Sequence, residues 1–494
     1  MVFKNYLIFD FGASNGRAVV ASFNGKKFLL DEVHRFDNRP VYIGENLFWD
    51  VLGLYSELKI SIQKSLNKYS NIESLGIDTW GSDFGLLDKN GKLISNPINY
   101  RDEQSLRDSK SLYRIIDERE LFGLTGADIS PIFDLFRLYS LKKNDETAIR
   151  HAKTYLSVGD LLNYFLTGKS FNEFTRFTTN VIYNQRVKKI ETSILERLGL
   201  SKEIFPGFIY PGQKIGDIYG KVSRELEIKP FSVITPSSHD TASAVAGVPS
   251  INKDIRWGFI SLGTWACLGI ENNKVLISDD IYNCKFLNEA GVEDTNIFAK
   301  NINGSWIIQQ CRNKWLKKKE IYWDEIVALT EKANPFSSFI DVDQPQFKAQ
   351  QVDMPAIIRD YCKNSGQKIP SSIGDVSRCV YESLCLKFRY YLKFLEKFSG
   401  QQLELLHITG GGAQNRLLCQ WISNATGKRV IVGPIEATSI GNLLIQLKAN
   451  TEINNIEEGR RLNYASSKLY EYVPMESAKW EEVYNRFVNL ISKR

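Results

Sequence analysis

The 494-residue sequence lacks the residue patterns that mark several classes of protein. Its seven cysteines are an odd number, and no two of them have the C-x-x-C spacing of a zinc or redox site. The longest apolar region, residues 259–270, is interrupted by glycine and is too short to cross a bilayer. The apolar stretch at residues 6–9 ends at Asp10, which is too early for the core of a signal peptide. We therefore expect a soluble, cytoplasmic protein with reduced thiols.

A strong excess of either charge is also missing. The net charge of +6 is small for this length, and basic and acidic residues are interspersed. The densest basic run, residues 312–319, is followed directly by Glu320, and no nucleic-acid recognition motif accompanies it. A solvated helix face is therefore favoured over a nucleic-acid patch, and we expect neither a nucleic-acid nor a membrane partner.

Two common nucleotide-binding signatures are absent as well. Gly168-Lys169-Ser170 looks like the end of a P-loop, but the upstream glycine that a P-loop requires falls on Asn163. We expect a helix C-cap and a turn at this position instead. Gly12 and Gly16 do not have the spacing of a dinucleotide fingerprint. No serine or cysteine is marked as a nucleophile by an elbow motif.

What the sequence does contain is one order of elements that occurs twice. Apolar segments at residues 5–10, 18–21 and 28–30 predict an antiparallel meander, followed by a helix over 50–69 and a strand at 74–78. The second half repeats this order of elements, with strands at 259–261 and 265–270, a long helix over about 373–398 and a strand at 405–408. This pattern predicts two related α/β domains, residues 1–246 and 247–494, with a cleft between them.

The turn between the first two predicted strands is the first candidate site. It reads Asp10-Phe-Gly-Ala-Ser-Asn-Gly-Arg17. Successive backbone N–H groups in such a turn can form an anion nest, to which Ser14, Asn15 and Arg17 add side-chain donors. Asp10, at the strand end, is placed to hold a metal ion through water. An ordinary hairpin turn is an equally good reading of this segment alone.

Two further candidates follow predicted strands. The segment from Ile77 to Phe84 brings together Asp78, Trp80, Gly81 and Asp83, a mixture that suits a sugar because carboxylates accept from hydroxyls and an indole covers the ring face. The alternative is a turn with a buried tryptophan.

The segment Ser237-Ser-His-Asp-Thr-Ala-Ser-Ala244 opens a small-residue helix. Either Asp240 or Ser238 merely caps that helix, or Asp240 points into the cleft as a base.

Two glycine-containing turns complete the set. They are Ser261-Leu-Gly-Thr264 and Thr409-Gly-Gly-Gly-Ala-Gln-Asn415, and each follows a strand. A triple glycine allows the backbone to approach a ligand closely or allows two elements to pack closely, and the sequence leaves both uses open.

Each motif is weak singly, and their order along the chain is more specific. With that order the sequence resembles the FGGY carbohydrate kinases, which are members of the actin-like ATPase group. The motifs that carry the resemblance are Asp10 to Arg17, Val33-His-Arg-Phe36, Gly76-Ile-Asp-Thr-Trp-Gly81, Ser238 to Ala244, Gly263-Thr-Trp265, Asn301-Ile-Asn-Gly-Ser-Trp306 with Gln309, Gly410 to Asn415, and Gly433 to Ala437 with Gly441-Asn442. They cover most of the chain.

The resemblance implies a fold of two ribonuclease-H-like domains flanking a catalytic cleft, with sugar, phosphates and base in the first domain and the nucleotide in the second. It implies ATP and Mg²⁺ as cofactors. The implied roles are phosphate binding by Ala13, Ser14, Asn15, Gly16 and Arg17, sugar binding by Gly81, His239, Asp240, Thr241 and Asn301, general-base catalysis by Asp240, and nucleotide binding by Thr264, Gln309 and Gly411.

Within the family, the resemblance is to the members that phosphorylate L-rhamnulose at O1. Ser82 stands where an apolar residue is expected, and Asn15 stands where serine or threonine is more usual. Ser82 lies beside the sugar turn, which leaves two alternatives: another ketose kinase of the family, such as one acting on L-fuculose, or a sugar sensor without catalysis.

Overall fold

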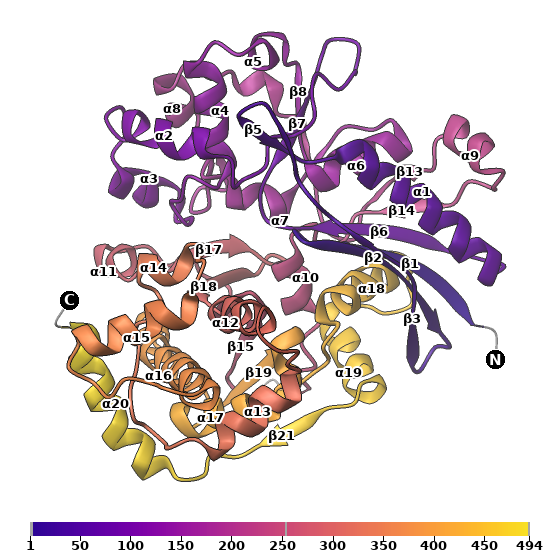
Figure 1. The fold of residues 1–494 in the computed structure, drawn as a ribbon. Helices are drawn as coiled ribbons and strands as arrows, with labels where there is room; N and C mark the ends of the chain where they lie inside the picture. Colours follow the sequence, from indigo (N-terminus) through magenta and orange to yellow (C-terminus); the bar gives the residue numbers. More distant parts are fainter. Residues whose placement is uncertain (1–2, 252–253, 493–494) are drawn as a thin grey trace. The chain divides into compact units, whose positions relative to one another are not determined.

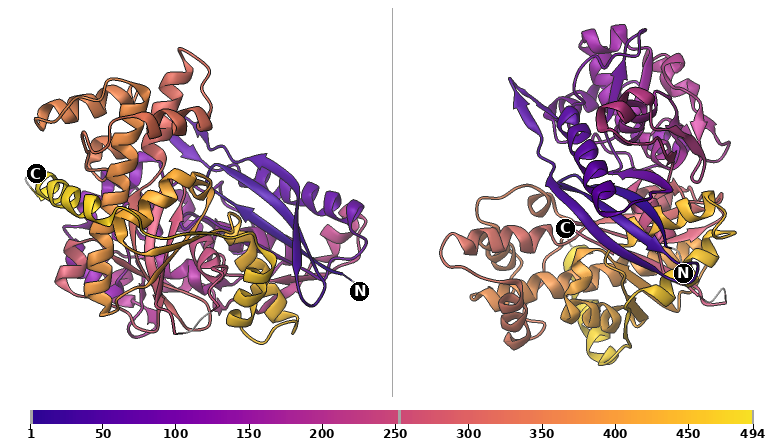
Figure 2. Two further views of the ribbon diagram at one scale, coloured as in Figure 1. Left: turned by 90° about the horizontal axis from the view of Figure 1, so that it is seen from below. Right: turned by 90° about the vertical axis from the view of Figure 1, so that its right-hand side faces the viewer.

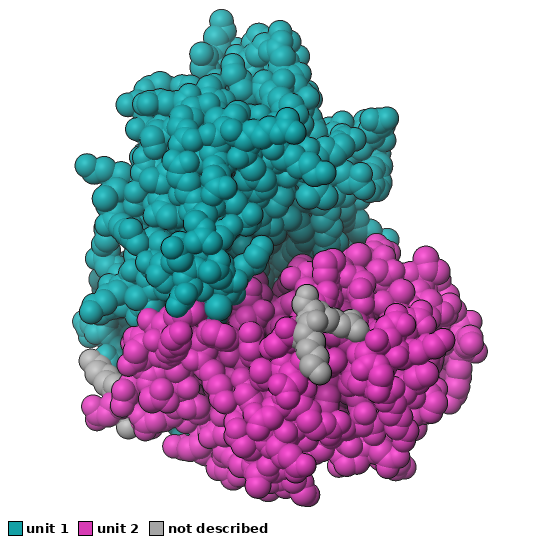
Figure 3. Space-filling model, turned by 90° about the vertical axis from the view of Figure 1, so that its left-hand side faces the viewer, with its two compact units in different colours: residues 1–251, 271–298, 437–466 teal, residues 252–270, 299–436, 467–494 magenta. Residues whose placement is uncertain are grey.

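The computed structural model describes residues 3–251 and 254–492. The chain divides into two compact units, drawn in different colours in Figure 3. Unit 1 comprises Met1–Ile251, Glu271–Phe298 and Ala437–Ser466, and unit 2 comprises Asn252–Ile270, Ala299–Glu436 and Ser467–Arg494. Each unit is built around a sheet of its own, and the element labels below are those of Figure 1.

The main sheet of unit 1 has the strand order β3-β2-β1-β6-β14-β13. Its strands are β1 (Lys4–Phe11), β2 (Asn15–Phe23), β3 (Phe28–Asp37), β6 (Ser74–Thr79), β14 (Ser232–Ile234) and β13 (Lys214–Asp217). Strands β1, β2 and β3 pair antiparallel, which confirms the predicted meander, and they form the long indigo ribbons of Figures 1 and 2. Strand β6 runs parallel to β1, and β14 runs parallel to β6.

Strand β1 is buried on both faces, to which its successive side chains point alternately. Leu7 and Phe9 of β1 pack in one apolar cluster with helices α1 (Val51–Lys68) and α6 (Val158–Thr167). Tyr6 and Ile8 pack in a second cluster with helices α18 (Ala437–Ala449) and α19 (Ile456–Ser466). The near-continuous apolar run of β1 therefore reflects a strand that is covered on both faces.

The predicted helix over 50–69 is confirmed as α1. Val51, Leu54, Leu58 and Ile62 recur at helical spacing and are buried on one face. Asp50 caps the helix, because its side chain accepts from the backbone N–H of Gly53.

The sheet of unit 2 repeats this topology. Its strand order is β17-β18-β16-β15-β19-β20-β21, in which β18-β16-β15-β19-β20 follow the same plan as β3-β2-β1-β6-β14. The strands are β15 (Trp257–Leu262), β16 (Trp265–Asn272), β17 (Leu287–Ala290), β18 (Asn296–Asn303), β19 (Leu405–Thr409), β20 (Arg429–Val432) and β21 (Tyr470–Tyr472). The boundaries between the two units fall inside β16 and inside β18, and β17 belongs to unit 1. The predicted repeat is thus confirmed at the level of topology.

The long helix predicted near 373–398 is α16 (Ile373–Ser399). It begins with a capping box formed by Ser372 and Asp375 and ends at Gly400, which has a positive φ. The other helices of unit 2 are α12 (Trp306–Leu316), α13 (Trp323–Lys332), α14 (Pro345–Lys348), α15 (Met354–Asn364), α17 (Arg416–Thr426) and α20 (Ser477–Ser492).

Helices α10 (Asp240–Ala246) and α18 pack against each other inside unit 1 at very short range (Figure 1). A Cβ built on Gly441 of α18 would overlap the carbonyl oxygen of Ser243 in α10, and one built on Gly247 would overlap the carbonyl oxygen of Ala437. Glycine is therefore required at both positions for this contact between backbones. The contact holds α18 beside the helix that begins at Asp240.

The remaining elements of unit 1 are short. They are β4 (Val41–Ile43), β5 (Asn46–Phe48), β7 (Phe84–Leu87), β8 (Thr154–Ser157), β9 (Asn172–Glu173), β10 (Tyr183–Asn184), β11 (Lys189–Ile190), β12 (Phe208–Ile209), α2 (Glu103–Leu112), α3 (Glu118–Thr125), α4 (Asp134–Lys143), α5 (Thr147–His151), α7 (Phe174–Phe177), α8 (Thr192–Arg197), α9 (Gly220–Leu226) and α11 (Asp279–Asn283).

Three smaller expectations can be compared with the structure. Gly168 is the C-cap of α6 with a positive φ, as predicted. The basic run straddles the end of α12, and Lys317, Lys318 and Lys319 are exposed. Among the described residues, no helix is both long and apolar enough to cross a membrane. The division of the chain at residues 246 and 247 stays a prediction.

Candidate active site

The β1–β2 turn, predicted to receive phosphates, is a tight hairpin in unit 1. The backbone N–H of Gly12 donates to the carbonyl of Asn15 at 2.9 Å, and Asn38 bonds to the carbonyls of Gly12 and Ser14. Ser14 and Asn15 are exposed at the tip. A Cβ on Gly16 would overlap the ring of Phe36, so this glycine serves packing. The turn is therefore held in shape by its own bonds while its tip is open to a ligand.

Asp10 and Arg17 form an ion pair across this hairpin. Their Cα atoms are partners in the β1–β2 ladder, and Oδ2 of Asp10 accepts from Nε of Arg17 at 3.0 Å and from Nη2 at 2.6 Å. The Oγ of Ser439 in α18 lies 3.5 Å from the same oxygen. All three of these contacts are made by Oδ2 of Asp10.

Asp78 lies directly beside Asp10, because the two are register partners in the parallel β1–β6 pair. It is fully buried, and its Oδ2 accepts from Nδ2 of Asn442 at 2.6 Å. Gln446, one turn later in α18, donates to Oδ1 of Asn442 and so fixes the direction in which that amide points. Burial, followed by the charge of Asp10, raises the pKa of Asp78 well above its usual value.

The sugar turn, residues 80–83, and the segment that leads into α10 lie side by side. The N–H of Thr79 donates to the carbonyl of Ser238 at 2.8 Å, and Thr79 forms an isolated parallel bridge with His239. A Cβ on Gly81 would lie 2.6 Å from Nε2 of His239. The structure thus brings the predicted sugar residues of unit 1 to one place, although more than 150 residues separate them in the sequence.

Asp83 has a different position from the one we predicted. It is 4% exposed, and its Oδ2 accepts from the indole N–H groups of Trp49 (2.5 Å) and Trp80 (3.1 Å) and from the backbone N–H of Tyr100 (3.2 Å). Burial, followed by the charge of Asp134, raises the pKa of Asp83, and the hydrogen bonds from Trp49 and Trp80 lower it. The pKa remains raised overall, to about 7. A direct bond to a sugar hydroxyl is not supported by this geometry. The carboxyl group instead holds two indoles and the turn that carries Gly81.

Asp240 is the first residue of α10. The alternative prediction, that Asp240 or Ser238 merely caps this helix, is wrong. The N-cap position is His239, which makes no side-chain cap hydrogen bond, and neither Asp240 nor Ser238 occupies that position. The side chain of Asp240 is 36% exposed, and Oδ1 accepts from Oγ1 of Thr241 at 3.2 Å. Its pKa is raised, chiefly by burial and also by the charge of Asp10, while nearby His239 lowers it.

Unit 2 contains a cavity of about 530 Å³. Two of the three residues predicted to bind nucleotide, Gln309 and Gly411, line it. The third, Thr264, is adjacent, because its Oγ1 lies 3.4 Å from Oε1 of Gln309. The other lining residues are Ser305, Ile308, Trp323, Asp324, Val327, Tyr381, Gly412, Gln414, Asn415, Arg416, Leu417 and Leu418. A cavity of this size and mixed polarity is typical of small-molecule and cofactor sites.

The three consecutive glycines, Gly410, Gly411 and Gly412, differ in what surrounds them. A Cβ on Gly410 would lie 2.9 Å from the carbonyl oxygen of Leu262, and one on Gly412 would lie 2.9 Å from the same atom. These two glycines let β19 pack closely on β15. A Cβ on Gly411 would meet nothing within 4 Å, and this residue lines the cavity. Gly411 is therefore the glycine at which backbone is open to a ligand.

Asn301 lies on β18, in the part of that strand that belongs to unit 2, and is half-buried. The predicted sugar residues are thus divided between the two units. A joint contact of Asn301 and the unit 1 residues with one sugar stays a prediction.

Similarity to known proteins identifies the family of this chain. The FGGY family of carbohydrate kinases matches the chain with its N-terminal domain model over residues 5–247 and with its C-terminal domain model over residues 258–450. The chain belongs to the FGGY family of carbohydrate kinases. This carbohydrate kinase is 35% identical to a rhamnulokinase of Bacteroides thetaiotaomicron over 488 residues, which cover 99% of each chain. It is 34% identical to a rhamnulokinase of Oceanobacillus iheyensis over 466 residues, covering 94% of this chain and 97% of the relative.

Solved structures establish the fold of this kinase. A xylulose kinase from Lactobacillus acidophilus matches with a TM-score of 0.83 at 14% identity, covering 99% of this chain and 98% of that one. A glycerol kinase of Plasmodium falciparum, crystallised with ADP, matches with a TM-score of 0.78 at 14% identity, with 99% and 98% coverage. The predicted α/β fold of two ribonuclease-H-like domains is confirmed.

Several residues that hold the site of this kinase were missed by sequence reasoning. Arg176 is completely buried and pairs with Asp134 at 2.7 Å, and its Nη2 also donates to the carbonyl of Asp83. Thr179, in the same segment, donates to the carbonyl of Gly81 at 3.0 Å. A buried arginine needs charged and polar partners, and one of the partners of Arg176 is the backbone of the sugar turn.

Glu173 fixes the segment that precedes the candidate base. This buried carboxylate accepts from the backbone N–H of Thr175, Arg176 and Ser238, the last at 3.1 Å. Oγ1 of Thr175 bonds in turn to Oγ of Ser237 at 2.8 Å. No local pattern marks Glu173 as a site residue, because its partner Ser238 lies 65 residues away.

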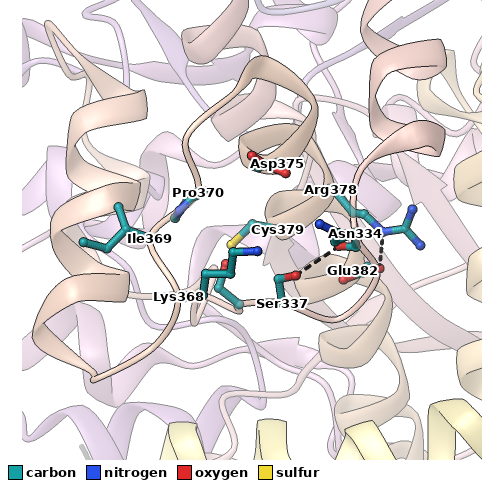
Figure 4. Close-up of a pocket in the computed structure, with 10 residues that line it drawn as sticks. Asn334, Ser337, Lys368, Ile369, Pro370, Asp375, Arg378, Cys379 and Glu382 are labelled. Atoms are coloured by element: carbon teal, nitrogen blue, oxygen red, sulfur yellow. Dashed lines mark hydrogen bonds and ion pairs between the residues drawn. The ribbon is translucent and has the colours of Figure 1, made fainter.

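A smaller hollow in unit 2, between α13, α15 and α16, is not a ligand site (Figure 4). Its volume of about 10 Å³ corresponds to roughly one water molecule. Glu382 there pairs with Arg378 at 2.6 Å and accepts from the N–H of Phe336 at 2.9 Å. Burial raises the pKa of Glu382 to about 7. This cluster joins α16 to the loop that follows α13 and serves stability.

Proposed function

We propose that this kinase transfers the γ-phosphoryl group of ATP to O1 of L-rhamnulose, giving L-rhamnulose 1-phosphate and ADP in the catabolism of L-rhamnose. The observation that carries the proposal is the similarity to proteins named rhamnulokinase, at 34–35% identity over nearly the whole chain. Solved sugar kinases with other names are only 14% identical and bear on the fold alone.

The nucleotide is assigned to unit 2. The cavity lined by Gln309 and Gly411 has room for the adenosine part of ATP, and Thr264 lies at its edge. The phosphates are assigned to the β1–β2 turn, where Ala13, Ser14 and Asn15 offer backbone and side-chain donors beside Gly16 and Arg17. Arg17 would contribute its charge to the phosphates while Asp10 keeps its guanidinium in place.

The sugar and the base are assigned to unit 1, with Asn301 as a further sugar contact. His239 and Thr241 both lie beside the carboxylate of Asp240, whose side chain is 36% exposed, and Gly81 lies beside His239. Asp240 would accept the proton of the O1 hydroxyl as O1 forms its bond to the γ-phosphorus and the bond from that phosphorus to the β–γ bridging oxygen breaks. Asp83 would act indirectly, because it holds Trp80 and the sugar turn.

Magnesium fits the site as an ion held mainly by phosphates and water. Among the described residues no group of three or more histidine, cysteine, aspartate or glutamate side chains could form a protein cage for a metal. Mg²⁺ commonly keeps several waters and uses one or two carboxylates. Asp10, near the end of β1, would hold such a water. The ion would neutralise charge on the phosphates.

Placement in the cytoplasm completes the proposal. ATP and reduced thiols are both features of that compartment, and the odd number of cysteines without C-x-x-C spacing agrees with reduced thiols. Because groups for one reaction divide between two units, we also propose that sugar and nucleotide together favour a closed arrangement that excludes water.

An ADP-release assay over a panel of ketoses and polyols tests the assignment. We expect the highest kcat/KM with L-rhamnulose and dependence on Mg²⁺. A much higher kcat/KM with L-fuculose would move the kinase to the alternative ketose, and one with glycerol would remove the ketose assignment altogether. If the protein turned over no ATP with any of these compounds, the sugar-sensor alternative would be favoured.

A further inference from the structure

The imidazole of His239 lies between two carboxylates, of which only one belongs to the proposed mechanism. Its Nε2 is 3.5 Å from Oδ1 of Asp240, and its Nδ1 is 3.3 Å from Oε2 of Glu289. The side chains of His239 and Glu289 are each 8% exposed, so water screens neither charge well. Glu289 lies on β17, about fifty residues after Asp240 in the sequence, and no motif marks it.

The charges in this row depend on one another. Burial alone would lower the pKa of His239, but the nearby charges of Glu289 and Asp240 raise it overall, while Arg176 opposes them. His239 in turn lowers the pKa of Asp240, against burial and against the negative charge of Asp10. Asp78 is the other carboxyl group that faces Asp240 electrostatically. The charge of His239 favours the ionised form of Asp240, and hydrogen bonds from Thr241 add to this effect.

We propose that Glu289 is a positioning residue of this kinase, which holds His239 as an imidazolium ion directed at Asp240 and thereby keeps the catalytic base ionised. The inference rests on the proposed role of Asp240. His239 does not take the substrate proton, which passes from the O1 hydroxyl to the carboxylate of Asp240 and leaves to water after ADP and the phosphorylated sugar have formed. His239 keeps its own protons throughout, so Glu289 acts on the base only through charge and orientation.

Gly81 agrees with this arrangement. A side chain at residue 81 would meet Nε2 of His239 at 2.6 Å, on the ring edge that faces Asp240. The absence of a Cβ there lets the imidazole stay between its two carboxylates. The sugar turn and the row of charges are therefore fitted to each other.

The first test is the pH dependence of kcat for Glu289→Gln, with Glu289→Asp as the conservative variant. Glutamine keeps the shape but not the charge, so His239 should lose its proton at lower pH and Asp240 should be harder to ionise. We expect the acid limb of the profile to move to higher pH by about half a unit or more, with kcat recovering toward wild type above that limb. Glu289→Asp should restore most of the shift. A loss of equal size at every pH, with the limb unmoved, would overturn the proposal.

Glu293→Gln is the matched control. Glu293 lies in the turn of the same β17–β18 hairpin, and its carboxylate pairs with Lys448 at 2.6 Å. Its replacement removes the same charge at a distance from His239, so the pH profile should stay that of wild type. A shift equal to that of Glu289→Gln would show a general effect of charge and would contradict the specific role of Glu289.

The second test needs no substrate and so separates this inference from the proposed function. The sequence has four histidines, which makes the imidazole signals few enough to follow by NMR, and His239→Asn identifies the one that belongs to His239. In the ligand-free protein, Glu289→Gln should lower the titration midpoint of His239 by about one pH unit. An unchanged midpoint in a folded variant would refute the charge coupling, whatever sugar the kinase phosphorylates.

Discussion

Asp240→Asn is the substitution that tests the assignment of the base most sharply, because the structure predicts little cost to the fold. Asp240 is the first residue of α10 and provides no cap hydrogen bond. Asparagine has the same shape, and its Oδ1 can still accept from Oγ1 of Thr241, the bond that Asp240 makes at 3.2 Å. Removing one negative charge also relieves repulsion by Asp10. We expect the free energy of unfolding to change by no more than about 1 kcal/mol.

The effect on catalysis should be much larger. An amide cannot take the proton of the O1 hydroxyl, and loss of a general base costs about 10²–10⁴-fold in rate. This corresponds to roughly 3–5 kcal/mol of transition-state stabilisation. The cavity of unit 2 is built from other residues, so the affinity for ADP should stay within about twofold of wild type.

The measurements are steady-state kcat by ADP release, ADP binding by calorimetry, and thermal unfolding. Asp217→Asn is the control, because Asp217 is an exposed aspartate whose carboxylate pairs with Lys214 at 2.7 Å and accepts from Oγ of Ser232 at 3.2 Å. It should keep wild-type kcat. If Asp240→Asn retained more than about a tenth of wild-type kcat, Asp240 would not be the base. Asp78 and Asp83 would then be the next candidates, although Asp78 is buried and Asp83 is bonded to two indoles.

Four other outcomes are expected. Gly411→Ala should fold normally and raise KM for ATP, because the new Cβ would extend into open space at the cavity. Gly410→Ala should instead lower the melting temperature, because Gly410 has a φ of 85° and the carbonyl oxygen of Leu262 would lie 2.9 Å from the new Cβ. Equal melting temperatures for the two variants would contradict this difference. Gly441→Ala should destabilise unit 1 by about 2 kcal/mol or more in denaturant unfolding, since a Cβ would overlap the backbone of α10; a wild-type midpoint would argue against the close packing of α10 and α18. Asp83 has a pKa raised to about 7 in the folded protein, so its contribution to stability is full below pH 4 and is lost as pH rises through 7. Asp83→Asn should therefore flatten this fall in the free energy of unfolding, by up to about 1.4 kcal/mol per pH unit. Parallel curves of unfolding free energy against pH for the variant and the wild type would exclude the raised pKa. Sugar and nucleotide together should reduce the radius of gyration in small-angle scattering, and an unchanged radius at saturation would argue against closure.

Local sequence patterns predicted the elements whose determinants are local. The spacing of Val51, Leu54, Leu58 and Ile62 identified α1, and the apolar segments with turns between them identified β1, β2 and β3. The pairing of β6 with β14 joins segments more than 150 residues apart, and no periodicity within either strand encodes it. The repeat of the topology could be predicted only as an order of elements.

The candidate site divides in the same way. The turns could be found because glycine and polar residues follow strands, and the family resemblance then assigned roles to them. The partners that hold the turns could not be found, since Glu173, Arg176 and Glu289 reach the site through tertiary packing. Asp83 was predicted to bind sugar because carboxylates accept from hydroxyls, but three protein donors already use it. Composition near a strand end identifies a site without showing which polar group remains open to the ligand.

The central claim is that L-rhamnulose is the acceptor, and a competition in one reaction tests it most directly. Equal concentrations of L-rhamnulose, L-fuculose and glycerol would be offered with limiting Mg·ATP, and the products would be identified by ³¹P NMR. The ratio of products under these conditions equals the ratio of the kcat/KM values. We predict that L-rhamnulose 1-phosphate takes up most of the transferred phosphate, with one ADP formed for each. Phosphate found mainly on L-fuculose or glycerol, or released as inorganic phosphate, would contradict the account.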